Sequence, residues 1–322
     1  MSDPLLKPLL AGDRRALARA ITLIESTRAD HRERADALLA ELLPRAGKSV
    51  RLGITGVPGV GKSTFIERFG LSLIGQGRSL AILAIDPSSK RGGGSILGDK
   101  TRMEELSRHQ AAFIRPSPAG ATLGGVARRT REAMLLVEAA GYDTVIVETV
   151  GVGQSETAVA DMVDMFIVLL VPAGGDDLQG IKRGVIELAD LLLVNKADGD
   201  LRPAAGRAAA DYAHALRLLR SPTENWVPEV ATCSALTGEG IDAVWSTVLR
   251  FRTAIGEAGL RQRRAAQARA WMWSEVGESL LADLKAHPDV RKQIAGLERD
   301  VIGGRTTPAA AARRLLQAFI GR

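Results

Sequence analysis

The strongest structural signal in this chain is GVPGVGKS, residues 56–63. It matches the pattern G-x-x-x-x-G-K-[ST], in which a glycine-rich loop turns successive backbone N–H groups toward a phosphate. The apolar run RLGIT precedes it and the helical segment TFIERFGLSLIGQG follows it, as the pattern requires. The stretch therefore predicts a phosphate-binding loop made of Gly56, Val57, Pro58, Gly59, Val60, Gly61, Lys62, Ser63 and Thr64.

Two side chains of this loop carry specific chemistry. Lys62 is placed to neutralise β- and γ-phosphate oxygens and is a candidate catalytic residue. The hydroxyl of Ser63 is a candidate Mg²⁺ ligand. The N-terminus of the following helix adds partial positive charge. A nucleoside triphosphate with Mg²⁺ is therefore the expected ligand.

Seven apolar runs alternate with amphipathic helical segments around this loop, through residues 48–256. Near-continuous apolar strands suit a sheet that is buried on both faces, and helices between strands indicate βαβ units. We predict an α/β fold with a mostly parallel central sheet flanked by helices, which binds its ligand at the C-terminal ends of the strands. The runs begin at Ser49, Ser79, Ala111, Asp143, Asp164, Ala189 and Val227.

Helical segments extend the predicted nucleotide domain at both ends. Residues 1–47 read as an N-terminal helical hairpin, with Asp13 as a helix cap. Residues 257–322 show helical spacing only, interrupted at Pro288. Because two or three helices make a poor domain alone, we expect this C-terminal arm to pack on something, such as a second copy of the chain.

Composition excludes several classes of protein. The 322 residues hold 43 Lys and Arg against 37 Asp and Glu, and the arm carries 12 of the basic and 7 of the acidic residues. A solvated helical arm explains this charge better than a nucleic-acid surface, since no aromatic-interleaved basic motif is present. The single cysteine, Cys233, and four scattered histidines exclude a disulfide framework and a cysteine-rich metal site.

We expect a cytoplasmic protein without a membrane partner. The strongest uncharged apolar run, residues 165–175, has eleven residues and is broken at Pro172, whereas a membrane span needs roughly 20. The N-terminal sequence lacks the basic start and apolar core of a signal peptide.

The stretch NKAD, residues 195–198, ends an apolar run and indicates guanine. An aspartate there can accept hydrogen bonds from N1–H and the exocyclic amine of guanine, and adenine offers neither donor in that arrangement. The lysine stem can lie on the base. The later stretch SAL can add backbone N–H contacts, although an ordinary turn explains it equally well. The predicted guanine-binding residues are Asn195, Lys196, Asp198, Ser234, Ala235 and Leu236.

Acidic residues between the two motifs are candidates for binding Mg²⁺ and positioning water. Glu148 ends an apolar run and starts ETVG, so the N–H of Gly151 can sense the γ-phosphate. Asp86 and Asp99 are further candidate metal ligands, although a strand-end cap also explains Asp86 and a purely structural role also explains Asp99. Gln154 can orient the attacking water or lie on the surface. We therefore name Glu148 and Gln154, with the loop lysine, as candidate catalytic residues.

Taken together, GVPGVGKSTFIE, AIDPSS, GDKTRM, IVETVGVGQSE, GGDDLQGIKRG and NKAD resemble the MeaB/ArgK family of P-loop GTPases, from about residue 10 to the end. The resemblance implies hydrolysis of GTP to GDP and phosphate. It also implies a chaperone of methylmalonyl-CoA mutase that gates adenosylcobalamin loading and protects the mutase from inactivation. Members dimerise through the C-terminal helices, which implies a homodimer. A loop containing Asp176, Asp177, Gln179 and Lys182 would relay the nucleotide state to the mutase.

Several alternatives stay open. The client can be a different cobalamin-dependent acyl-CoA mutase. A metallochaperone GTPase would need paired cysteines or a histidine-rich arm, and this sequence has neither. A kinase for transported amino acids would need an acceptor pocket and usually a base. A non-hydrolysing nucleotide-binding scaffold would lack GTP turnover.

Overall fold

The computed structural model describes residues 3–85, 103–116, 123–149, 155–172, 183–219, 221 and 223–321. The chain divides into two compact units, Met1–Ala265 and Ala266–Arg322. None of the helices in the described ranges combines the length and the apolar character that a membrane crossing requires. The division of the chain at residues 47 and 256 stays a prediction.

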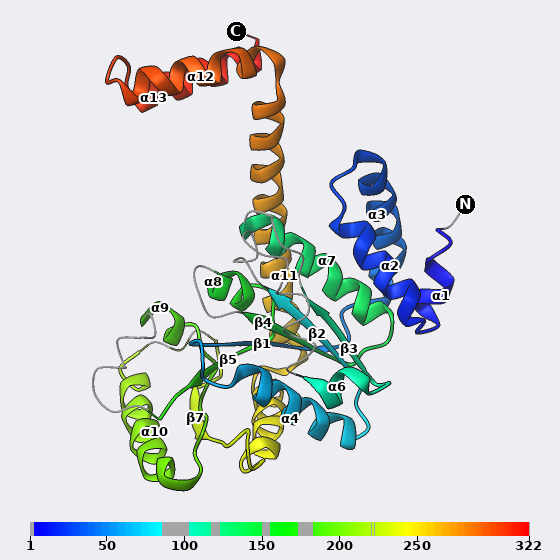
Figure 1. Cartoon of the computed structure of the whole chain (residues 1–322), viewed down its shortest axis with the longest axis vertical. Coiled ribbons are helices and arrows are strands. Elements are labelled where there is room, and N and C mark those ends of the chain that lie inside the picture. The colour runs from blue at the N-terminus through cyan, green and yellow to red at the C-terminus, as the bar shows by residue number, and fades with distance from the viewer. Residues whose placement is uncertain are drawn as a thin grey trace. The chain divides into compact units, whose positions relative to one another are not determined.

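In the described part of the first unit, seven strands form one sheet in the order β3-β2-β4-β1-β5-β6-β7 (Figure 1). Every neighbouring pair is parallel, which confirms the predicted fold class. Parallel strands with buried side chains on both faces account for the continuous apolar runs in the sequence. The strands are β1 (Val50–Gly56), β2 (Leu80–Ile85), β3 (Ala112–Pro116), β4 (Thr144–Thr149), β5 (Met165–Leu170), β6 (Leu191–Val194) and β7 (Glu229–Thr232).

Helices cover both faces of this sheet, and a separate apolar core lies under each face. On one face, Phe65 and Phe69 stack with ring centroids 5.5 Å apart. On the other face, a Cβ at Gly53 would lie 2.8 Å from side-chain atoms of Phe166 and Val159, so glycine lets a helix approach β1 closely. The first face carries α4 (Lys62–Gly75), α6 (Glu104–Arg108) and the start of α11 (Ile241–Ala286); the second carries α7 (Leu123–Ala139), α8 (Ser155–Ala160) and α10 (Arg202–Leu216).

The predicted N-terminal helical hairpin is present as α2 (Arg14–Glu25) and α3 (Ala29–Leu42), which pack on α7. The Oδ1 atom of Asp13 accepts hydrogen bonds from the backbone N–H groups of Arg15 and Ala16, at 2.7 and 3.1 Å, and so caps α2 as predicted. A short helix that the sequence did not suggest separately, α1 (Leu6–Leu10), precedes the hairpin, and a 3-10 turn, Leu43–Arg45, follows it.

The second unit contains the end of α11 with α12 (Pro288–Ile302) and α13 (Pro308–Ile320). Thr307 caps α13 by accepting a hydrogen bond from the N–H of Ala310 at 3.2 Å. Helices α12 and α13 pack on each other. A stripe of large apolar side chains on α11 is nevertheless exposed in the single chain, namely Met272, Trp273, Val276, Leu280 and Leu281.

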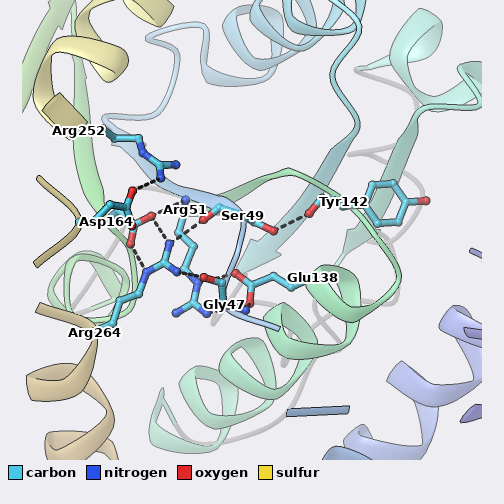
Figure 2. A network of polar contacts seen from close by, with 9 residues as sticks. Gly47, Ser49, Arg51, Glu138, Tyr142, Asp164, Arg252 and Arg264 are labelled. Carbon is cyan, nitrogen blue, oxygen red and sulfur yellow. Dashed lines mark hydrogen bonds and ion pairs between the residues drawn. The ribbon is translucent and has the colours of Figure 1, made fainter. Parts of the chain in front are cut away.

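A network of charged side chains, which we call the junction network, lies at the N-terminal edge of the sheet (Figure 2). Arg264 of α11 donates to both carboxylate oxygens of Asp164, at 2.7 and 2.6 Å, and to the carbonyls of Gly47 and Ser49, at 2.5 and 2.6 Å. The backbone N–H of Arg51 donates to the same aspartate at 2.9 Å. The network thus joins the segment before β1, the start of β5 and the first unit's part of α11.

Burial makes the junction network energetically important. The side chain of Asp164 is 1% exposed and that of Arg264 is 19% exposed. Burial would lower the pKa of Arg264, but the hydrogen bonds and charge of Asp164 outweigh it and raise that pKa above its ordinary value. The neighbouring Arg263 contacts Asp190, just before β6, at 3.3 Å, so adjacent arginines hold the starts of two strands.

We predict that Arg264→Met lowers the free energy of unfolding by about 3–5 kcal/mol, because it leaves the Asp164 carboxylate buried without its cation. The measurement is chemical denaturation of the full chain. Arg250→Met is the matched control on the same helix, because the pair of Arg250 with Glu229 is exposed and should contribute less than about 1 kcal/mol. Equal losses in the two variants would contradict this account of the network.

Candidate nucleotide-binding site

The glycine-rich loop leaves the C-terminal end of β1 and enters α4 at Lys62. Two of its glycines are required by their surroundings. At Gly56 a Cβ would lie 2.6 Å from the carbonyl oxygen of Leu169. Gly61 has φ of +93°, and a Cβ there would lie 2.8 Å from Nδ2 of Asn195. The loop therefore depends on glycine both for its backbone conformation and for its contact with the end of β6.

Side-chain donors bind the carbonyls of this loop. The ammonium group of Lys62 donates to the carbonyls of Gly56 and Val57, at 2.7 and 3.3 Å. The side chain of Lys62 therefore lies against the backbone at the start of the loop. Its positive charge lies where the motif places the β- and γ-phosphates of a nucleotide.

The NKAD stretch supplies two further donors to the same loop. Nδ2 of Asn195 donates to the carbonyl of Val60 at 2.8 Å, and the ammonium group of Lys196 donates to the carbonyl of Gly59 at 2.8 Å. Four loop carbonyls are thus engaged by side chains. These carbonyl dipoles are fixed by protein donors, which reduces their repulsion of a bound anion.

Asn195 also binds the segment that follows β7. Its Oδ1 accepts a hydrogen bond from the N–H of Ala235 at 3.0 Å and lies 3.6 Å from Sγ of Cys233. Burial raises the pKa of the Cys233 thiol to about 12, so the thiol stays protonated near neutral pH and can donate. The sequence did not single out this role of Cys233, although its place directly before SAL is a signal for it.

The residues after Asn195 that the sequence predicts to bind guanine differ in conformation and burial. Lys196 has φ of +60°, a left-handed conformation that is uncommon outside glycine and that is found at functional sites. The carboxylate of Asp198 is half-buried and has no hydrogen-bond partner among the described residues. Of the SAL residues, Ser234 and Ala235 are buried, and the side chain of Leu236 is 72% exposed.

Among the predicted metal ligands, the structure describes Ser63 and Glu148. Ser63 is the second residue of α4, and Glu148 lies near the end of β4, in register with Ile54 of β1, and is 6% exposed. Hydroxyl and carboxylate oxygens are suitable Mg²⁺ ligands, so this donor set fits the ion. The predicted site residues outside the described ranges are Asp86, Asp99, Gly151, Gln154, Asp176, Asp177, Gln179 and Lys182.

The glycine-rich loop, the buried Glu148 and the NKAD stretch meet at the C-terminal edge of one parallel sheet, which is the arrangement of a P-loop GTPase. A profile of the family described as methylmalonyl Co-A mutase-associated GTPase MeaB matches residues 17–289. The chain belongs to this family, which confirms both the resemblance and the predicted GTPase activity.

Named relatives cover nearly the whole chain. The mouse protein named methylmalonic aciduria type A homolog, mitochondrial, is 52% identical over 99% of this chain and 80% of its own length. The Escherichia coli GTPase ArgK is 49% identical over 94% of this chain and 92% of its own length. A solved structure titled LAO/AO transport system kinase is 41% identical, with a TM-score of 0.79 over 99% of this chain and 97% of that one.

We predict that Asp198→Asn weakens GTP binding about 100-fold and abolishes the preference for GTP over ATP. The asparagine replaces one acceptor oxygen of the carboxylate with an NH2 group, which would face an N–H donor of guanine. The measurement is the dissociation constant for each nucleotide. Asp200→Asn is the control, since it makes the same charge change two residues away at an exposed position. Intact selectivity in Asp198→Asn would show that another residue recognises the base.

Proposed function

We propose that this GTPase is a chaperone of methylmalonyl-CoA mutase that gates adenosylcobalamin loading and protects the mutase from inactivation. The observation that carries the proposal is the family match over residues 17–289, because the family is described by its association with that mutase. The name of the mouse relative is consistent with the same metabolic step. We place the protein in the cytoplasm, with GTP and GDP as its ligands and no nucleic-acid partner.

Each described site residue has a part in the proposed hydrolysis. Lys62 and the loop N–H groups hold the β- and γ-phosphates, while Asn195, Lys196 and Asp198 hold guanine. Mg²⁺, when bound, would be held by Ser63 and Glu148 and would neutralise phosphate charge. Water attacks the γ-phosphorus, and the bond to the bridging oxygen breaks to give GDP and phosphate.

The segments that contain Asp86, Asp99, Gly151 and Gln154 complete this proposal. Asp86 and Asp99 would join the metal ligands, Gly151 would contact the γ-phosphate and Gln154 would orient water. The loop of residues 176–182 comes six to twelve residues after the end of β5 in the sequence. We propose that its side chains Asp176, Asp177, Gln179 and Lys182 contact the mutase.

The test is GTP hydrolysis by the purified chain with and without methylmalonyl-CoA mutase. We expect a slow rate that rises when the mutase is added, because a partner that binds the hydrolysis-competent conformation more tightly increases its population. Lys62→Ala is the control and should show no turnover in either condition. A rate that is unaffected by this mutase but rises with another cobalamin-dependent acyl-CoA mutase would identify that other mutase as the client. Absence of GTP turnover would favour a nucleotide-binding scaffold.

We further propose that the protein is a homodimer formed through the exposed apolar stripe of α11. Trp273 and Leu280 are 65% and 54% exposed in the single chain, and a contiguous apolar stripe of this kind marks an interface. Leu280→Asp should give a monomer in light scattering. Ala282→Asp is the control, since that exposed residue lies about 200° around the helix from Leu280. A dimer that survives Leu280→Asp would place the interface elsewhere.

A further inference from the structure

A hollow of about 380 Å³ lies between α4, α6 and the SAL segment. Thr64 of α4 lines one side, and Ala235 and Leu236 line another. Thr64 directly follows the predicted phosphate and metal ligand Ser63, and residues 235–236 belong to the predicted base-binding segment. The hollow therefore lies beside both the phosphate end and the base end of the nucleotide site. In a nucleotide, the group that connects these two ends is the ribose.

The charges of the hollow favour a neutral group with hydroxyl donors. Its walls include three carboxylates, those of Glu67, Glu104 and Glu105, and one cation, Arg68. Ionised carboxylates only accept hydrogen bonds, and they repel phosphate. A ribose offers two hydroxyl donors without charge. Acidic side chains that accept hydrogen bonds from ribose hydroxyls recur in other nucleotide-binding folds.

Among the three carboxylates, Glu67 is the one that accepts a hydrogen bond from another of the described residues. One of its oxygens accepts a hydrogen bond from the backbone N–H of Glu105 at 2.9 Å, which joins α4 to the first turn of α6. Glu67 is half-buried, whereas Glu104 and Glu105 are exposed. It also follows Ser63 by four residues, so the two lie on the same face of α4. A side chain fixed in this way loses little rotamer freedom when it binds a ligand.

We propose that this hollow receives the ribose of GTP and that Glu67 accepts a hydrogen bond from its 2′- or 3′-hydroxyl. Glu67 is then a specificity-determining residue that selects ribonucleotides over deoxyribonucleotides. The proposal rests on the GTP-binding function above, and it concerns only the sugar of that ligand.

The first test compares dissociation constants of the wild-type chain for GTP, 2′-deoxy-GTP and 3′-deoxy-GTP, measured by calorimetry. At least one deoxynucleotide should bind about 10- to 100-fold more weakly, which is the usual effect of losing a hydrogen bond to a charged group. Equal affinity for all three nucleotides would overturn the ribose proposal. Failure to bind GTP itself would instead overturn the proposed function.

The second test assigns the residue. In Glu67→Gln, GTP binding should weaken by about tenfold while the affinity for the discriminated deoxynucleotide stays unchanged, so that discrimination shrinks. Glu33→Gln is the control, an exposed residue of α3 with the same charge change. Glu104→Gln and Glu105→Gln are measured alongside. The assignment to Glu67 would be overturned if Glu67→Gln still discriminated between GTP and the deoxynucleotide as the wild-type chain does. It would also be overturned if only Glu104→Gln or Glu105→Gln lost this discrimination.

Discussion

The side-chain amide of Asn195 is the interaction on which the nucleotide site depends. It donates to the carbonyl of Val60 and accepts from the N–H of Ala235, so one buried group connects the loops that follow β1, β6 and β7. Buried amides need partners on both ends, and these contacts leave the amide a single favourable orientation. The phosphate loop and the base-binding segment are therefore held at a fixed separation. Gly61 is part of the same constraint, because a side chain there would collide with the amide.

Ion pairs stabilise the opposite, N-terminal edge of the sheet. Asp164 and Asp190 precede β5 and β6, and each binds an arginine of α11 as well as a backbone N–H of a neighbouring strand. Burial raises the pKa of Asp190, and the charge of Arg263 partly offsets this effect. Polar groups thus fix both ends of strands whose middles are apolar. The hydrogen bonds that these carboxylates accept from N–H groups of neighbouring strands hold the start of each strand against its neighbour.

The sequence predicted the seven strands and the phosphate loop because their signals are local. Apolar runs, the glycine spacing and the cap at Asp13 each depend on residues close together in the chain. The junction network could not be predicted, because Arg264 and Asp164 are one hundred residues apart and neither residue is unusual in its own segment. The same holds for the contact of Lys196 with Gly59, which depends on how β1 and β6 are placed in the sheet.

The hydrogen bonds of Lys62 bear on how the site takes up phosphate. Its ammonium group is held by two neutral carbonyls within the loop, and a phosphate oxygen is a stronger acceptor for a cation than either of them. Binding of nucleotide can therefore replace weaker hydrogen bonds with stronger ones at the same place. The carbonyls of Gly59 and Val60 keep their donors from the base-binding segment, because Asn195 and Lys196 reach them from the side of β6. The loop can thus exchange the hydrogen bonds of Lys62 while those of Asn195 and Lys196 stay in place.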